Sequence, residues 1–222
     1  MDDRPLTASQ RFSYALSLNG AREFTVTREH RIRHCFAKPV IPVISDWSAG
    51  TAPLTPATCV ILQGATVVEL PELIAHFESA PLNNICLLAH VDLLSGLENN
   101  ESGIEYLAQF SRVDGIVSVH AHLIGPAKKR GLLTVARVFL SDSRALDRGL
   151  KLLTKTAPDV IDLLPAAAAV SVADRFDNVT IPRIAGGLCR NEADVEAVIR
   201  CGCSAVTSTR PDLWRLNSPQ HS

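Results

Sequence analysis

The chain has 222 residues, 46% of them hydrophobic and 5% aromatic, and a formal net charge of −1. This near-neutral charge argues against a surface that is basic overall and binds nucleic acid everywhere. No apolar run is long enough to cross a membrane, and no apolar signal core follows the N-terminus, so we expect a cytoplasmic protein without a membrane partner. The six cysteines lack CxxC spacing, which predicts free thiols and no metal site.

Residues 1–38 differ from the rest of the chain because they are basic. They hold seven Lys or Arg residues against four Asp or Glu residues. Two stretches, Ser9–Leu18 and Thr27–Cys35, are compatible with helices. We interpret residues 1–38 as an N-terminal arm or flanking helix ahead of one domain, residues 39–222.

From Pro39 onward, short apolar runs alternate with stretches of helical spacing. The runs are four to seven residues long and mostly rich in Val, Ile or Leu, as buried parallel strands are. The predicted strands are Val40–Ile44, Cys59–Leu62, Ile85–Val91, Gly115–Val119, Leu133–Phe139, Val160–Leu163, Ile181–Ala185 and Ala205–Ser208. The predicted helices are Leu70–Phe77, Ile104–Phe110, Ala121–Lys129, Ser143–Thr154, Ala166–Phe176, Glu192–Arg200 and a short Asp212–Leu216. Prolines and a glycine in Trp47–Thr58 argue against a full helix there.

Eight strands that alternate with helices predict an α/β fold of one of two kinds. A closed (β/α)8 barrel of the TIM type repeats one strand and one helix eight times. A doubly wound open sheet more often has fewer strands. The pattern therefore favours the barrel, with the basic N-terminal arm ahead of it. Ligands of such barrels bind at the carboxyl ends of the strands, where we look for functional residues.

The ends of the seventh and eighth strands carry the clearest sign of a ligand site. Two adjacent glycines let the backbone approach an anion closely. Three hydroxyl residues precede Arg210 and Pro211, which can open a short helix. Barrels often bind phosphate at these two loops. We predict a phosphate site at Gly186, Gly187, Thr207, Ser208 and Thr209; the alternative is a tight turn and helix caps.

Polar residues also end the third and fourth strands. Strand alternation puts His90 and Asp92 on one face, where Asp92 can bind a ligand hydroxyl or act as a general base. Ser118 and His120 likewise share a face and are rim candidates. For each pair a structural role stays open, as an ordered loop or a helix cap.

Asp162 lies inside the sixth predicted strand, where an unpaired charge is costly. It therefore needs a partner or a ligand. Arg137 and Arg183 are the available cations, and a pair between Arg137 and Asp162 on neighbouring strands would need no function.

Three groups of cations are candidates for contact with RNA, although such groups are more often simply solvated. They are Lys128, Lys129 and Arg130; the predicted helix with Arg144, Arg148, Lys151 and Lys155; and the arm with Arg28, Arg31 and Arg33. The chain has no Walker loop, Rossmann fingerprint or Ser-His-Asp elbow. No lysine ends a predicted strand, which argues against a Schiff-base aldolase.

Six stretches span most of the predicted barrel in order: Leu88–Leu97, Asp114–Ser118, Arg137–Ser143, Pro182–Gly187, Ala205–Thr209 and Leu213–Trp214. Together they resemble the glycerol-3-phosphate-responsive antiterminators of glycerol uptake operons. The resemblance implies a barrel-shaped regulator that senses glycerol 3-phosphate and prevents early termination in a nascent leader mRNA, without catalysis or a cofactor. It implies that Gly186, Gly187, Thr207 and Ser208 hold the phosphate and that Asp92 lies near the glycerol hydroxyls. His90 and Asp162 are further candidates for the hydroxyls.

The chain departs from the family pattern at two strand ends. It has Ser118-Val119-His120 where the family usually has Ser-Thr-Arg, and Asp162-Leu163-Leu164-Pro165-Ala166 where the family usually has Glu-Val-Leu-Pro-Gly. A mostly neutral His120 weakens an anion or RNA contact at that rim. Ala166 limits close backbone approach at its loop.

We therefore expect a glycerol-3-phosphate-sensing regulator of glycerol metabolism that acts by transcription antitermination on a leader mRNA, and we also consider a homo-oligomer. One alternative is an isomerase or lyase that acts on a small phosphorylated substrate through Asp92, His90 or His120. Another is a sensor that binds a phosphorylated metabolite and a protein partner but no RNA.

Overall fold

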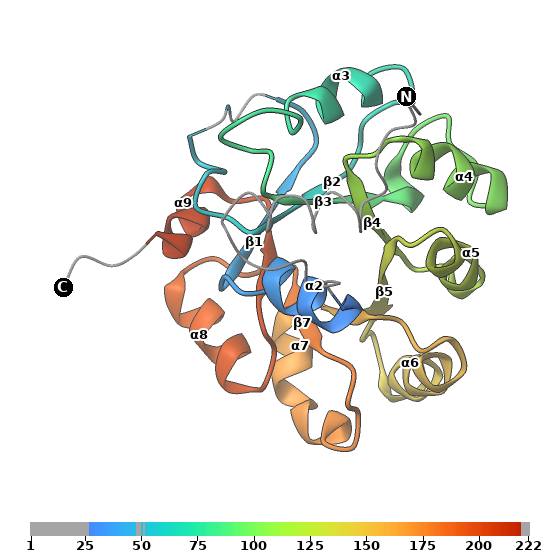
Figure 1. The fold of residues 1–222 in the computed structure, drawn as a ribbon. Helices are drawn as coiled ribbons and strands as arrows, with labels where there is room; N and C mark the ends of the chain where they lie inside the picture. Colours follow the sequence, from blue (N-terminus) through green and yellow to red (C-terminus); the bar gives the residue numbers. More distant parts are fainter. Residues whose placement is uncertain (1–26, 48–49, 51, 219–222) are drawn as a thin grey trace.

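The computed structural model describes residues 27–47, 50 and 52–218, and their strands form a closed parallel barrel (Figure 1). Each strand pairs with the next along the chain, and the last pairs with the first. The (β/α)8 prediction is confirmed and the open sheet is excluded. The strands are β1 (Val40–Ile44), β2 (Cys59–Leu62), β3 (Cys86–His90), β4 (Val113–Ser118), β5 (Leu133–Phe139), β6 (Val160–Leu164), β7 (Arg183–Gly186) and β8 (Val206–Ser208).

Helices follow the strands from β2 onward and surround the barrel (Figure 1). The described residues between β1 and β2 form turns and no helix, as their prolines predict. The α-helices are α2 (Arg28–Cys35), α3 (Leu70–Ala75), α4 (Glu101–Gln109), α5 (Ile124–Lys129), α6 (Ser143–Thr156), α7 (Ala166–Ser171), α8 (Glu192–Arg200) and α9 (Pro211–Trp214). Short 3₁₀ helices are η1 (Val91–Leu93), η2 (Ala121–Leu123), η3 (Ala173–Phe176) and η4 (Arg215–Asn217).

Several elements begin or end away from their predicted bounds, among them β7, α4 and α7. Strand β7 starts at Arg183 rather than Ile181 because Pro182 has no N–H to donate to a ladder. Helix α4 starts at Glu101, three residues early, since the Asn100 side chain accepts from the N–H of Gly103 and caps it. The single helix predicted at 166–176 is interrupted at Val172, which separates α7 from η3. The helix predicted at Ser9–Leu18 lies outside the described residues.

The barrel interior changes from apolar to polar along its axis. Alternate residues of each strand point inward. Near the amino ends of the strands, one buried apolar cluster contains Ile41, Cys59, Cys86, Leu133 and Val160. Inward positions nearer the carboxyl ends carry Gln63, His90, Arg137, Asp162 and Thr207. A second cluster packs the outer strand faces against the helices. The polar layer therefore lies at the carboxyl end of the barrel.

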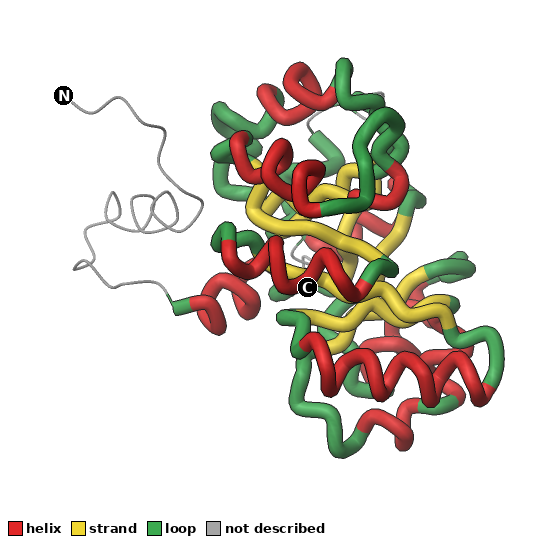
Figure 2. Tube along the Cα trace, turned by 90° about the vertical axis from the view of Figure 1, so that its right-hand side faces the viewer, coloured by secondary structure: helices red, strands yellow, loops and turns green. Residues whose placement is uncertain are grey.

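Helix α2 covers the amino end of the barrel; Figure 2 shows it on the left, where the described chain begins. Cys35 and Phe36 belong to the interior apolar cluster. Arg31 is only 4% exposed and donates to the carbonyls of Gly131 and Asp114 at 3.1 and 3.2 Å. These contacts make α2, which lies within the predicted arm, part of the packed structure.

Candidate ligand site at the carboxyl end of the barrel

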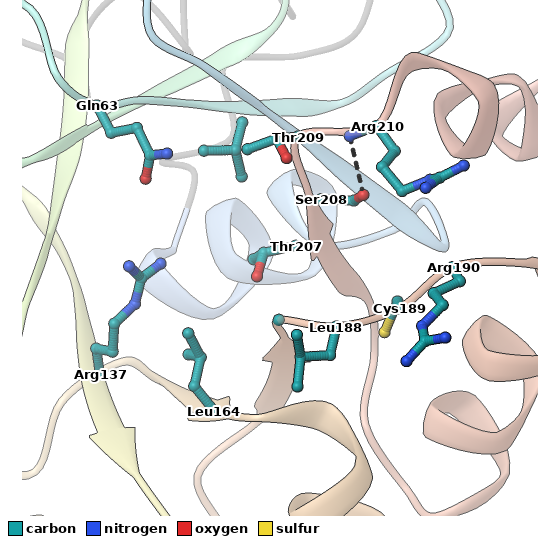
Figure 3. Close-up of a pocket in the computed structure, with 12 residues that line it drawn as sticks. Gln63, Arg137, Leu164, Leu188, Cys189, Arg190, Thr207, Ser208, Thr209 and Arg210 are labelled. Atoms are coloured by element: carbon teal, nitrogen blue, oxygen red, sulfur yellow. Dashed lines mark hydrogen bonds between the residues drawn. The ribbon is translucent and has the colours of Figure 1, made fainter.

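A cavity of about 460 Å³ opens at the carboxyl ends of the strands (Figure 3). Several of its lining residues come from β1, β5, β6 and β8 and the positions just beyond β2 and β7. This volume is within the range of small-molecule sites. Its lining residues are Val43, Gln63, Arg137, Leu164, Gly187, Leu188, Cys189, Arg190, Thr207, Ser208, Thr209 and Arg210.

Four of the five residues predicted to hold a phosphate line this cavity, and the fifth supports it. Gly187 has φ +77°, a left-handed conformation that favours glycine. It lines the cavity together with Thr207, Ser208 and Thr209. A Cβ on Gly186 would lie 1.9 Å from Oγ1 of Thr207. Gly186 therefore leaves room for the Thr207 hydroxyl inside the barrel.

The loop after β7 has backbone N–H groups that can bind an anion, and the loop after β8 is held in place by hydrogen bonds. Within the described residues, the N–H groups of Gly187 and Leu188 have no backbone acceptor. Ser208 is held from both ends: its Oγ accepts from the N–H of Arg210 at 3.1 Å, and its carbonyl accepts from Nε1 of Trp214 at 2.8 Å. The β8–α9 connection is thereby rigid, which suits a preformed site.

Three arginines line the cavity, and their charges are compensated to different degrees. Arg210 pairs with Asp212 at 2.8 Å, and this partner raises the pKa of Arg210. Arg137 pairs with Asp162. Among the described residues, no carboxylate pairs with the guanidinium of Arg190, whose backbone N–H is instead held by Asp194 at 2.7 Å. Arg190 therefore carries the uncompensated charge at this rim, and no sequence motif had marked it.

Arg137 lies in the cavity wall and forms a triad with Asp162 and His90 behind it. Nε of Arg137 donates to Oδ2 of Asp162 at 2.9 Å, and Nη2 lies 2.9 Å from the same oxygen; the two residues are register partners on β5 and β6. The predicted Arg137–Asp162 pair is thus confirmed. Nη1 of Arg137 lies 2.5 Å from Nε2 of His90. A guanidinium has no acceptor, so His90 accepts through Nε2 and carries its proton on Nδ1.

Burial shifts the proton equilibria of this triad. His90 is 2% exposed, and burial together with the Arg137 charge lowers its pKa to about 4, against a smaller opposing effect of Asp92. The ring is therefore neutral at pH 7. Burial raises the pKa of Asp162, and the Arg137 charge opposes that shift. Nδ1 of His90 and Oδ1 of Asp162 are buried without a hydrogen-bond partner.

The other predicted hydroxyl and rim residues form a separate network beside the cavity. Oδ1 of Asp92 accepts from Oγ of Ser118 at 2.6 Å, and Oδ2 accepts from the N–H of Val119 at 2.7 Å. His120 is half exposed, and its Nε2 lies 3.9 Å from Asp92. None of Asp92, Ser118 and His120 is among the described lining residues of the cavity. These hydrogen bonds tie the end of β3 to the end of β4, whereas no hydrogen bond joins His90 to Asp92.

The candidate RNA contacts divide into engaged and free cations. Lys128 bonds to the carbonyl of Ala157, and Arg130 pairs with Glu101 and Glu105. Lys129 is exposed at the end of α5. Arg28 holds Asp159 through two bonds of 2.6 Å, so that arginine and Arg31 serve the docking of α2. The exposed cations of α6 share one face at helical spacing: Arg144, Arg148, Lys151 and Lys155.

Two classes of site are missing from the described part of the chain. No helix there has the length and apolar character needed to span a bilayer. No cluster of His, Cys, Asp and Glu there has the geometry of a metal site.

Comparison with known proteins supports the same regulatory family. The model of the glycerol-3-phosphate responsive antiterminator family matches residues 40–214. The uncharacterized protein YgcP of Escherichia coli K12 is 32% identical over 127 residues, which are 57% of this chain; the match spans 66% of that relative, just under two thirds of its length.

Solved structures agree with this result. A glycerol uptake operon antiterminator regulatory protein from Listeria monocytogenes superposes with a TM-score of 0.73 and 30% identity over 80% of this chain and 95% of that one. An antiterminator-related protein from Thermotoga maritima gives a TM-score of 0.71 and 24% identity over 80% and 98%, which shows the fold alone. Because the family model covers well over half of the chain, the chain belongs to the glycerol-3-phosphate responsive antiterminator family.

Proposed function

We propose that this chain is a cytoplasmic regulator that binds glycerol 3-phosphate in the cavity at the carboxyl end of the barrel and controls antitermination through a leader mRNA. The family indicates the class of ligand and the mode of regulation. The observation that carries the site is the cavity itself: three arginines and three hydroxyl residues line it, and none of its described lining residues is acidic. Such a wall favours a phosphate over a cation.

The phosphate end of the ligand fits the edge formed by the loops after β7 and β8. The N–H groups of Gly187 and Leu188 can donate to phosphate oxygens, and the hydroxyl of Thr209 lies on the same wall. Arg190 adds a positive charge for the phosphate, because no described Asp or Glu pairs with its guanidinium. These residues complement a dianion at the loops where barrels commonly bind phosphate.

The lining supports sensing rather than catalysis. Its described residues include no Asp, Glu, His or Lys, which are the usual side chains for proton transfer. Cys189 is the only thiol among them, and burial, assisted by Asp194, raises its pKa to about 11. That thiol stays protonated at pH 7 and is a poor nucleophile. An isomerase or lyase would therefore have no such acid or base among the described lining residues.

Isothermal titration with glycerol 3-phosphate tests the ligand site. We expect saturable binding to the native chain and about tenfold weaker binding to Arg190→Ala, since a charge-assisted contact contributes roughly 1.5–3 kcal/mol when well ordered and less at a rim. Arg200→Ala is the matched control because it removes an arginine from the other end of α8, where Arg200 pairs with Glu196. Absence of binding to the native chain, or equal losses in both variants, would refute this site.

A gel-shift assay tests the RNA partner. The probe is the leader transcript of a glycerol operon from the same genome, with and without glycerol 3-phosphate. We expect binding that changes with the ligand, because regulation requires different RNA affinities in the bound and free states. A chain that binds glycerol 3-phosphate but shifts no leader under either condition would be a sensor of another partner.

A further inference from the structure

Buried partners hold the Arg137 side chain on one side, and its other side faces the cavity. Nε of Arg137 donates to Asp162 and Nη1 donates to His90, while Nη2 lies 2.9 Å from Oδ2 of Asp162. A guanidinium has five N–H groups, so three on the two terminal nitrogens, one on Nη1 and two on Nη2, are not used by these two hydrogen bonds. Arg137 is also a lining residue of the cavity, so its terminal nitrogens can donate to a ligand there. The side chain is thus a fixed two-donor fork on the cavity wall.

The partners of Arg137 are suited to fixing it. Asp162 is fully buried and balances its charge, so the fork does not need an anion from the ligand. His90 is neutral and serves only as an acceptor, because burial holds its pKa at about 4. A charge-balanced donor of this kind suits neutral oxygens, such as hydroxyls, better than a second phosphate.

Arg137 also lies across the cavity from the phosphate edge. Figure 3 shows Arg137 on the left with Gln63 above it, while Arg190 and Arg210 lie on the right and Thr207 between them. Gln63 adds an amide that can donate or accept at the same wall. A ligand whose phosphate occupies the edge at Gly187 therefore presents its other end to Arg137.

We propose, on the basis of the proposed function, that Arg137 is a specificity-determining residue whose free N–H groups bind the hydroxyl oxygens of glycerol 3-phosphate. Asp162 and His90 are positioning residues for it and do not touch the ligand. Asp92 was predicted to bind these hydroxyls, but both of its carboxylate oxygens already accept hydrogen bonds from Ser118 and Val119. The proposal assigns the hydroxyl contacts to Arg137 instead. Selectivity for a hydroxylated three-carbon phosphate then arises inside the barrel, away from the phosphate itself.

Binding of two phosphate esters tests this role. n-Propyl phosphate has the same three carbons and phosphate as glycerol 3-phosphate but no hydroxyls. We expect the native chain to bind glycerol 3-phosphate at least about tenfold more tightly than n-propyl phosphate, because a hydrogen bond from a charged donor to a hydroxyl contributes about that much to affinity. In Arg137→Met/Asp162→Leu this preference should vanish while the affinity for n-propyl phosphate stays within about twofold.

The double substitution removes both charges, because Arg137→Met alone would leave Asp162 buried and unpaired. Arg175→Met/Asp147→Leu is the matched control, since it deletes an ion pair at 3.0 Å outside the cavity and should keep the preference. Arg137→Lys is the second variant, and its folding is checked by circular dichroism. It keeps a charge opposite Asp162 but loses the fork, so the preference for glycerol 3-phosphate should fall.

The outcomes separate this inference from the proposed function. If the native chain binds neither ester, the proposed function fails and the role of Arg137 fails with it. If the native chain binds both esters equally, or if the Arg137 variants weaken both equally or neither, phosphate binding stands and the role of Arg137 is refuted.

Discussion

At the scale of the residue, His90 links the stability of the barrel to pH. Its pKa is about 4 in the folded chain and about 6.5 in an unfolded one, chiefly because of burial. Between these values the unfolded chain binds the proton and the folded chain does not, so stability falls as pH falls. We expect His90 alone to lower the free energy of unfolding by about 3 kcal/mol between pH 7 and pH 4.

Urea denaturation at several pH values measures this effect. His90→Gln is the control, because an amide oxygen can accept from Arg137 and does not titrate. The difference between the two proteins isolates His90 from the carboxylates, which both proteins share. Parallel stability curves for the two proteins would show that His90 is not held neutral.

Gly186 and Thr207 are a matched pair of neighbouring positions in the barrel interior. A Cβ on Gly186 would lie 1.9 Å from Oγ1 of Thr207 and 3.0 Å from its carbonyl oxygen. We expect Gly186→Ala to destabilise the chain by about 1–3 kcal/mol, as overpacking does, and to weaken binding of glycerol 3-phosphate. Thermal unfolding measures the loss of stability.

The double variant Gly186→Ala/Thr207→Ala identifies the cause of that loss. Removing Oγ1 removes the closest contact, so part of the stability should return. The two changes would then be non-additive, as changes in touching residues are. Strict additivity would locate the cost of Gly186→Ala elsewhere.

At the scale of the element, strands were predictable because their burial is continuous. β1, β2 and β5 have their predicted bounds: every residue of β1 and β2 is buried, and β5 is buried from Leu133 to Ala136. Helix starts were less predictable. The cap at Asn100 was missed because the first turn of α4 is polar and contains Gly103, which weakens the apolar pattern.

The site was predictable only where two neighbouring loops each carry several residue types that bind phosphate. The glycines and hydroxyls after β7 and β8 stand out in sequence, and the cavity lies beside them. Arg137 was predicted only as a partner of Asp162, because strand register decides which face of β5 meets the barrel interior. Gln63 and Arg190 are single polar residues in loops, and no spacing distinguishes them from ordinary solvent contacts.

Helix α2 should protect the thiols at the amino end of the barrel. Cys59 and Cys86 are buried in the cluster that Cys35 and Phe36 cover. Arg31→Ala removes two hydrogen bonds from a charged group, so we expect opening of α2 and alkylation of Cys59 and Cys86 to rise by about tenfold or more. Pulse alkylation followed by peptide mass spectrometry measures each thiol.

Arg33→Ala is the control for this experiment, because Arg33 is exposed on the same helix. It should leave both alkylation rates unchanged. Equal rates in Arg31→Ala and the native chain would mean that apolar contacts alone keep α2 in place.

At the scale of the whole molecule, β5 and α6 connect the ligand cavity to the free cations. β5 carries Arg137 and continues through Asp142, whose Oδ1 accepts from the N–H of Ala145 and caps α6. Arg144 and Arg148 lie in the first half of α6, close in sequence to the carboxyl end of the barrel where the cavity opens. This segment links Arg137 to the cationic face of α6 along the chain; coupling also requires that the ligand-bound and free states differ in their affinity for RNA.

The salt dependence of RNA binding tests that surface. Each cation that neutralises an RNA phosphate steepens the fall of log K with log salt by about 0.7 for single strands and 0.9 for a duplex. Arg148 is exposed and on the shared cationic face of α6, so Arg148→Ala should lower the slope by about that amount and weaken all leader sequences alike. Arg130→Ala removes the same charge from a residue already paired with Glu101 and Glu105, so its slope should stay near that of the native chain. A reversed ranking of the two variants would place the RNA at the end of α5, and unchanged slopes in both would move it to another face of the barrel.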